Sequence, residues 1–307
     1  MKIAQIWHLL RNTFKEWSED KAPRLAAALA FYTAFSLAPL LVIVFSLAGI
    51  LFGKQLVQSA FVNQLGNLIG SRSAQAIIFL LQNVQASGKS LIATLIGLAT
   101  LLFASSGVFG QLQDALNTIW EVKLKPDGGW MRVIQKRFFS FTLVMGLGFL
   151  LLVSLIISAV LSSTSQYLFS LVPGLTFLLQ VFNFLLSFVV VTLIFGMIFK
   201  VLPDAHIAWR DVWLGAAVTA LLFEIGKWLI GVFLGNASFS STYGAAASLV
   251  VILLWVYYST QILFFGAEFT QVYANTFGSR IVPDQDAVSL GETTRSEQGI
   301  PHKEALR

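Results

Sequence analysis

The sequence predicts an all-α fold: a polytopic membrane protein built as a six-transmembrane-helix bundle. Two observations lead to this class. Residues 138–199 contain no Asp, Glu, Lys or Arg, whereas one spanning helix needs only about 20 apolar residues. The composition agrees, because 56% of the residues are hydrophobic and 11% are charged, compared with about 25% charged residues in soluble domains.

Six segments are apolar enough to span a bilayer. The uncharged run is interrupted by hydroxyl side chains at Ser162–Ser165 and by the turn dipeptide Pro173-Gly174, so it holds two spans. The predicted spans are residues 30–53, 90–113, 138–162, 177–200, 212–234 and 245–270. They form a single transmembrane domain, residues 23–275.

Three segments lie outside this domain or between its spans. Residues 1–22 carry apolar side chains at helical spacing, with Arg11 and Lys15 between them. They predict an amphipathic helix that lies on the inner membrane surface or docks against the cytoplasmic ends of the spans. Apolar residues between positions 56 and 84 predict short amphipathic helices in the first outer loop. Residues 276–307 are polar without apolar periodicity, so we expect a disordered tail.

The basic residues predict the orientation. Sixteen Lys and Arg residues lie in the N-terminal segment, the second and fourth loops and the tail, against three in the remaining loops. This bias places both termini in the cytoplasm. It also explains the net charge of +5 without a nucleic-acid partner. The chain has no cysteine and only three scattered histidines, so we expect no metal site and no cofactor.

Several motifs are more specific than hydropathy. Residues 24–40 read RLAAALAFYTAFSLAPL, and the sixth predicted span combines STYG at 241–244, LWVY at 254–257 and FGAE at 265–268. With Asn117 and Trp120 after the second span and FEIGK at 223–227, they resemble the YihY/BrkB family, whose members were once labelled ribonuclease BN. The resemblance covers roughly residues 10–275. It implies a six-helix protein of the bacterial inner membrane, with lipid or envelope-component transport proposed for some members.

The fifth predicted span contains two charged residues near its middle. Glu224 and Lys227 are three residues apart and therefore share a helix face. Counted from Val212, Glu224 lies about 18 Å along the helix, close to the middle of the bilayer. An ionisable pair at this depth indicates a substrate or proton pathway. A packing clamp, in which the two charges neutralise each other, explains the pair equally well.

The sixth predicted span carries a polar stripe. Tyr257, Gln261 and Glu268 follow one another at intervals of four and seven residues, and Asp114 ends the second span at a similar depth. Asp114 and Glu268 are therefore candidates to line one inward-facing vestibule, although hydrated carboxylates at a membrane boundary need no such role. Asp211 in the first turn of the fifth span complements the helix dipole.

Two further features have ordinary structural explanations. Ala26, Ala30, Ala34 and Ala38 repeat at four-residue intervals in the first span, and Gly231 and Gly235 do so in the fifth. Such small residues indicate close helix packing, with self-association as the alternative. Trp120, Trp130, Trp209 and Trp213 lie near predicted inner boundaries, where they are expected to anchor the protein.

The leading functional hypothesis is a transporter or a protein that translocates lipid or another anionic amphiphile. Its polar cavity would lie between the first, second, fifth and sixth spans. Membrane lipids are then the expected partners, and homo-oligomerisation stays open. The alternative is a non-transporting scaffold or assembly factor. A ribonuclease or intramembrane enzyme is the weakest hypothesis, because no Ser/His pair or set of metal ligands falls within the spans.

Overall fold

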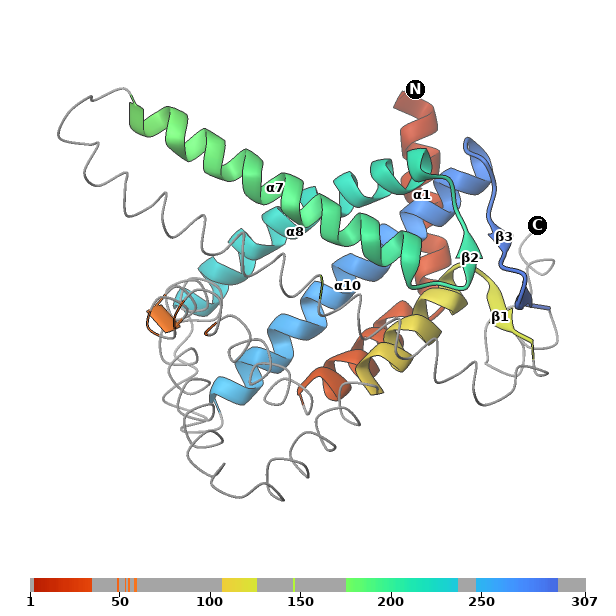
Figure 1. Cartoon of the computed structure of the whole chain (residues 1–307), viewed down its shortest axis with the longest axis horizontal. Helices are drawn as coiled ribbons and strands as arrows, with labels where there is room; N and C mark the ends of the chain where they lie inside the picture. Colours follow the sequence, from red (N-terminus) through yellow and green to blue (C-terminus); the bar gives the residue numbers. More distant parts are fainter. Residues whose placement is uncertain are drawn as a thin grey trace, which may run out of the picture.

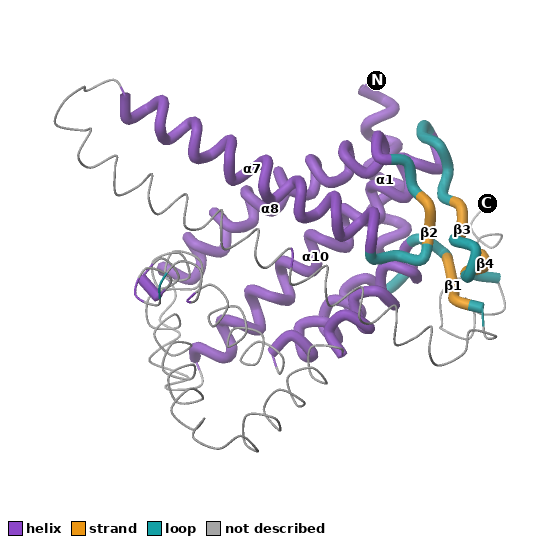
Figure 2. Tube along the Cα trace, in the orientation of Figure 1, coloured by secondary structure: helices purple, strands orange, loops and turns teal. Residues whose placement is uncertain are grey.

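The computed structural model of the chain describes residues 3–34, 107–125, 175–236 and 247–291, together with six isolated positions between them. Helices make up most of this part (Figures 1 and 2). Apart from these isolated positions, the predicted span 138–162, most of the spans 30–53 and 90–113, and the predicted helices of the first loop lie outside the described residues.

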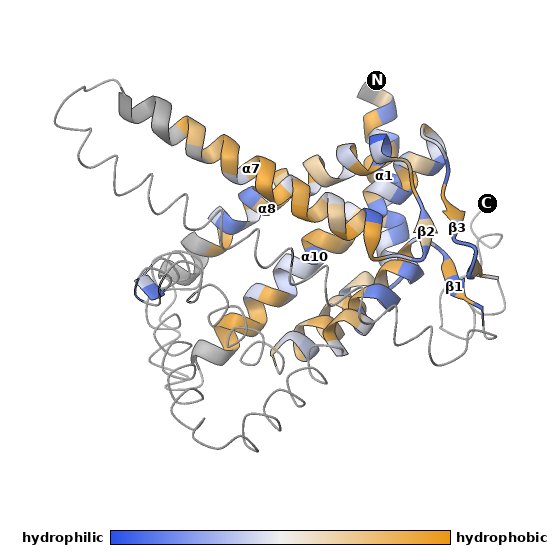
Figure 3. Cartoon of the chain, viewed as in Figure 1, coloured by the Kyte–Doolittle hydropathy of each residue, from blue (hydrophilic) through white to orange (hydrophobic). Residues whose placement is uncertain are grey.

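Three long helices form the body of the molecule. They are α7 (Leu175–Val201), α8 (Trp209–Asn236) and α10 (Ala247–Thr276), which correspond to the last three predicted spans. Each contains a segment long and apolar enough to cross a bilayer: Phe184–Val201, Trp209–Ile230 and Val250–Thr276. Hydrophobic residues run along all three (Figure 3). The membrane class is confirmed, and the total of six spans stays a prediction.

The N-terminal part packs around this body. Helix α1 (Ile3–Glu19) lies at one end and crosses α10 at an angle (Figure 1). Its Leu9 packs against Phe269 and Val272 of α10. A turn with a positive φ at Lys21 leads into a helical segment at residues 22–34, and a further helical segment covers residues 107–119.

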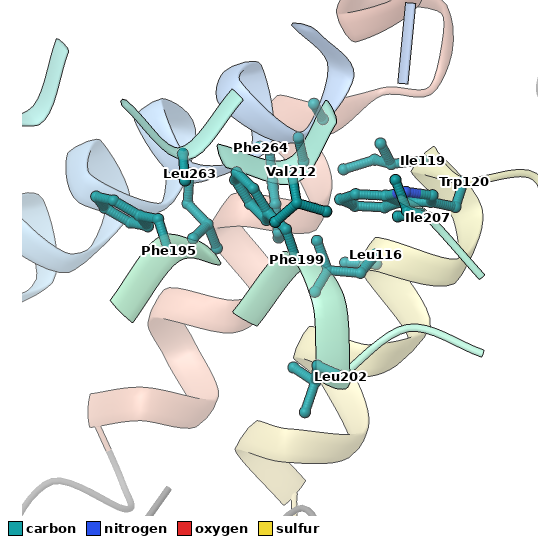
Figure 4. Close-up of a cluster of buried hydrophobic side chains, with 14 of the residues drawn as sticks. Leu116, Ile119, Trp120, Phe195, Phe199, Leu202, Ile207, Val212, Leu263 and Phe264 are labelled. Carbon is teal, nitrogen blue, oxygen red and sulfur yellow. The ribbon is translucent and has the colours of Figure 1, made fainter. Parts of the chain in front are cut away.

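All these helices meet at the buried core, to which α1 contributes the partly buried Trp17. Apolar side chains from segments 22–34 and 107–119 meet those of α7, α8 and α10 (Figure 4). Ala26 and Ala30 are buried, as close packing of the first span requires. Trp120 is only 2% exposed, and its ring lies 5.7 Å from that of Phe199. The prediction that Trp120 anchors at a membrane boundary is therefore wrong.

Four short strands correct the all-α prediction. They are β1 (Val122–Leu124), β2 (Ala205–His206), β3 (Val282–Pro283) and β4 (Ala287–Ser289). Strand β1 pairs antiparallel with β4, and β2 pairs antiparallel with β3. Part of the tail predicted to be disordered is thus ordered by hydrogen bonds to two distant loops. Hydropathy cannot reveal such pairing, because the partner strands supply backbone groups and little apolar surface. Residues 292–307 lie outside the described part.

These strands gather several chain segments at one end of the molecule. The segment after residue 119, the α7–α8 loop, the residues after α10 and helix α1 all lie there (Figure 1). The same segments are the ones rich in Lys and Arg, which the sequence predicts to lie on the cytoplasmic side. Their side of the membrane stays a prediction, but their common location agrees with the alternating topology.

Candidate functional site

Helices α8 and α10 are held together by a reciprocal glycine–threonine contact. A Cβ added at Gly266 of α10 would lie 2.7 Å from the Cβ of Thr219 of α8. One turn away, a Cβ at Gly215 of α8 would lie 2.8 Å from the Cβ of Thr270 of α10. Each threonine hydroxyl donates a 2.7 Å hydrogen bond to the carbonyl oxygen of the glycine four residues earlier in its own helix. The contact fixes the antiparallel register of the two helices.

The same interface continues toward the middle of α8. A Cβ at Gly226 would lie 2.6 Å from Cε1 of Tyr258 and 2.7 Å from Cδ1 of Ile262. The rings of Phe223 and Trp255 meet edge to face at 6.2 Å. Gly226 lies between the two predicted site residues of α8, so the backbone that carries them is held closely against α10.

Glu224 and Lys227 form an ion pair on α8, near the midpoint of that helix. The Ser187 hydroxyl of α7 lies 3.4 Å from Oε1 of Glu224 and donates to it. The two charged side chains differ in exposure, because Glu224 is 11% exposed and Lys227 is 35% exposed. The carboxylate therefore points between α7 and α8, and the ammonium group is the accessible member of the pair.

The surroundings of this ion pair are apolar. Ile225 and Trp228 are exposed on the neighbouring face of α8, and Phe184 and Leu185 are exposed on α7. Within a bilayer such surfaces face lipid. Lys227 is thus reached across a hydrophobic surface, which makes it a candidate contact for an acidic group carried on an apolar molecule.

The polar stripe of α10 lies on a different side of that helix. Residues advance by about 100° each along an α-helix, so Gln261 and Glu268 face roughly opposite to the Gly266 contact with α8. Tyr257 packs against the core, Oε1 of Gln261 has no hydrogen-bond partner among the described residues, and Glu268 is 0% exposed. The structure therefore brings Glu224 and Lys227 together and does not join Tyr257, Gln261 and Glu268 to them.

Asp114 and Glu268 also differ in their surroundings, because Asp114 is exposed whereas Glu268 is fully buried. The inward-facing polar residues of segment 107–119 are instead Gln113 and Asn117. Their amide nitrogens donate to Oδ2 of buried Asp204 at 3.1 and 2.9 Å. The Asp204 backbone N–H donates in turn to Oδ1 of Asn117 at 2.8 Å.

Asp204 is the residue that sequence analysis missed. It lies in the loop that joins α7 to α8, where a Pro-Asp dipeptide predicts only a turn. The side-chain amides of Gln113 and Asn117 could have indicated a buried carboxylate nearby, since buried carboxylates need such donors. This junction links the second predicted span to the loop between the fourth and fifth, and we treat it as structural.

Asp211 does more than complement the dipole of α8. Its Oδ2 accepts hydrogen bonds from the backbone N–H of Ser279 at 2.9 Å and from the Ser279 hydroxyl at 2.8 Å. A Cβ at Gly278 would lie 2.6 Å from the Asp211 carboxyl carbon. Asp211 therefore fixes the chain where it leaves α10, just before β3. Within the described ranges, no group of three His, Cys, Asp or Glu side chains is placed to hold a metal ion.

Comparison with known sequences gives consistent matches over most of the chain. The profile of the family described as virulence factor BrkB matches residues 13–290. A UPF0761 membrane protein of Ralstonia nicotianae is 30% identical over 269 residues, which cover 86% of this chain and 58% of the relative. One from Tolumonas auensis is 28% identical over 274 residues, covering 87% and 82% of the two chains.

A third relative shows the same pattern. The UPF0761 membrane protein of Alcanivorax borkumensis is 31% identical over 265 residues, which cover 83% of this chain and 57% of the relative. The chain thus spans less than two thirds of the length of the Ralstonia and Alcanivorax relatives. No solved structure matches the chain.

Proposed function

The chain belongs to the BrkB family of membrane proteins, and from that premise we propose that it transports or translocates an anionic amphiphile, a lipid-like molecule with an acidic headgroup. The supporting observation is the α8 ion pair of Glu224 and Lys227, whose ammonium is accessible while its carboxylate is largely buried. Ionisable groups inside a span are costly, and they usually belong to a substrate or ion pathway.

The geometry suggests how such a headgroup would bind. An incoming phosphate or carboxylate can replace Glu224 as the partner of Lys227, because the ammonium group lies nearer the surface. Ser187 is placed to donate to the displaced Glu224 or to the headgroup. The acyl part of the molecule would lie against the exposed apolar residues Ile225 and Trp228. The headgroup thus stays paired while it is inside the membrane.

A scaffold without transport activity is the second candidate function, and one observation favours it. The ion pair is complete within a single helix, which is all that a packing role requires. Membrane helix contacts of the kind seen between α8 and α10 stabilise a bundle whether or not a substrate is present. The two candidates differ in what they require of Lys227: transport requires that its ammonium group be accessible to a headgroup, whereas packing requires only that it pair with Glu224.

Transport can be measured with purified protein in liposomes. Movement of labelled phosphatidylglycerol or phosphatidic acid between leaflets should be faster than in protein-free liposomes, and labelled phosphatidylcholine should move more slowly than either. Equal rates with and without protein for all three headgroups would refute the proposed transport.

Three variants then separate the two candidate functions. Lys227→Met and Glu224→Gln each break the pair, and the exchange of both residues (Glu224→Lys with Lys227→Glu) restores it with the cation at the less exposed position. Thermal unfolding in detergent reports folding for each variant. Under the transport proposal the exchanged pair folds like the wild type but moves anionic lipid more slowly. If the exchanged pair moves lipid at the wild-type rate, the position of the ammonium is irrelevant and the proposed binding mode is wrong.

A further inference from the structure

Helix α1 has two apolar faces, and only one of them is covered by the described part of the chain. Leu9 and Thr13 are buried, with Leu9 against α10. The adjacent face carries Ile6, Trp7, Leu10 and Phe14, all of which are exposed. Trp7 is 71% exposed and Phe14 is 60% exposed, which is far more than a protein surface in water usually leaves uncovered.

We propose that this exposed face of α1, made of Ile6, Trp7, Leu10 and Phe14, docks into the boundary between the headgroups and acyl chains of the lipid bilayer. The helix then acts as an interfacial anchor held rigidly to α10. The proposal is independent of transport, because a scaffold would need the same anchor.

The depth at which α1 meets α10 supports a lipid partner. The apolar segment of α10 that can span a bilayer ends at Thr276. Val272 and Phe269, which hold Leu9, lie four and seven residues before that end, or about 6 and 10 Å at 1.5 Å per residue. Interfacial helices bury their apolar face about 5–10 Å into the boundary region. Leu9 is therefore attached to α10 at a depth, counted from the end of this segment, that matches the depth of interfacial helices.

Charge and size also favour lipid over a protein partner. Arg11 lies at the edge of the exposed face, and Lys15 lies one turn further along, toward the polar side of α1. Both are exposed, as is usual where basic side chains reach lipid headgroups. A second copy of the chain would need more surface. Two exposed aromatic side chains of about 150–250 Å² each, with two half-exposed aliphatic ones, fall short of the roughly 800 Å² that each partner buries in a standard interface.

The absence of cysteine from the chain allows a direct test on the full protein in liposomes. Single cysteines replace Trp7 or Phe14 and carry a nitroxide spin label. The matched controls are His8→Cys and Lys15→Cys, each the next residue along the helix and exposed on its polar side. All four side chains are exposed, so folding should be retained, and size-exclusion chromatography verifies it. Collision of each label with oxygen and with a water-soluble nickel chelate reports its depth.

Labels at positions 7 and 14 should show an oxygen-to-nickel collision ratio severalfold higher than labels at 8 and 15. Equal ratios at the paired positions would overturn the proposal, because the face would then be in water. A second result would also overturn it. If a label at 7 or 14 is shielded from both reagents and its spectrum is broadened by the same label on another copy in fully labelled protein, a second copy covers the face.

Discussion

Replacing Gly266 by alanine tests whether α8 and α10 pack as closely as the structure shows. The added Cβ would lie 2.7 Å from Cβ and 2.8 Å from Cγ2 of Thr219, and closer still to its Oγ1. It is attached to the backbone and cannot rotate away. Thr219 is itself held by its hydrogen bond to Gly215, so the helices must separate to admit the new methyl group.

The magnitude follows from these distances. Carbon atoms pack at about 3.5–4.0 Å, so the two carbon contacts alone require α8 and α10 to move apart by at least about 1 Å at this point. Overpacking of this kind typically costs about 1–3 kcal/mol. Alanine in place of glycine within a helix returns about 0.5–1 kcal/mol. We therefore expect a net destabilisation of about 1–2 kcal/mol, which lowers Tm by about 2–8 °C.

The assay is thermal unfolding of purified protein in detergent, followed by the fluorescence of its eight tryptophans. Gly196→Ala in α7 is the matched control, because its Cβ would meet Ala216 at an ordinary 3.8 Å. The double variant Gly266→Ala with Thr219→Gly removes all three atoms that crowd the new Cβ. In that background Gly266→Ala should be neutral or stabilising.

Two results would refute this reasoning. One is a Tm for Gly266→Ala no lower than that of Gly196→Ala, which would mean that the helices do not approach this closely. The other is an equal effect of Gly266→Ala with and without Thr219. The two substitutions would then be additive, whereas contacting residues show interaction energies of about 0.5–3 kcal/mol.

Two further predictions concern the end of the molecule where the loops meet. Asn117→Leu removes two of the hydrogen bonds of buried Asp204 and should destabilise the protein by about 1–3 kcal/mol. Lys123→Gln, at an exposed position of β1, should leave Tm within about 1 °C, and equal effects of the two substitutions in thermal unfolding would contradict the junction. Deleting residues 280–307 removes β3 and β4 and should speed backbone amide exchange in β1, while deleting only residues 292–307 keeps every described strand and should not. Fast exchange in β1 of the intact chain would show that the strands do not persist.

The helical spans were predictable because their signal is local. A run without charge or a stretch of about 20 apolar residues is decided by the solvent that surrounds it, and α7, α8 and α10 occur where hydropathy places them. The same holds for the amphipathic pattern of residues 1–22, which could not decide between lipid and protein contact. The structure shows why both were plausible, since Leu9 meets α10 while Trp7 and Phe14 are exposed.

The site was only partly predictable. Spacing alone placed Glu224 and Lys227 on one face, and the structure pairs them. Spacing could not say how the helices are rotated against one another. Hence it suggested one cavity for residues that the structure separates, with Glu268 on the side of α10 away from α8 and Asp114 exposed.

Membrane class, the location of the spans described here and the Glu224/Lys227 pair thus follow from composition and periodicity within short segments. The Gly266/Thr219 contact, the link between Asn117 and Asp204 across 87 residues and the order of residues 282–289 depend on segments that are distant in sequence. Each of these exists only once two distant segments are fixed relative to one another. A close backbone approach or a hydrogen bond is made by a pair of positions, so it leaves no periodic pattern in either segment alone.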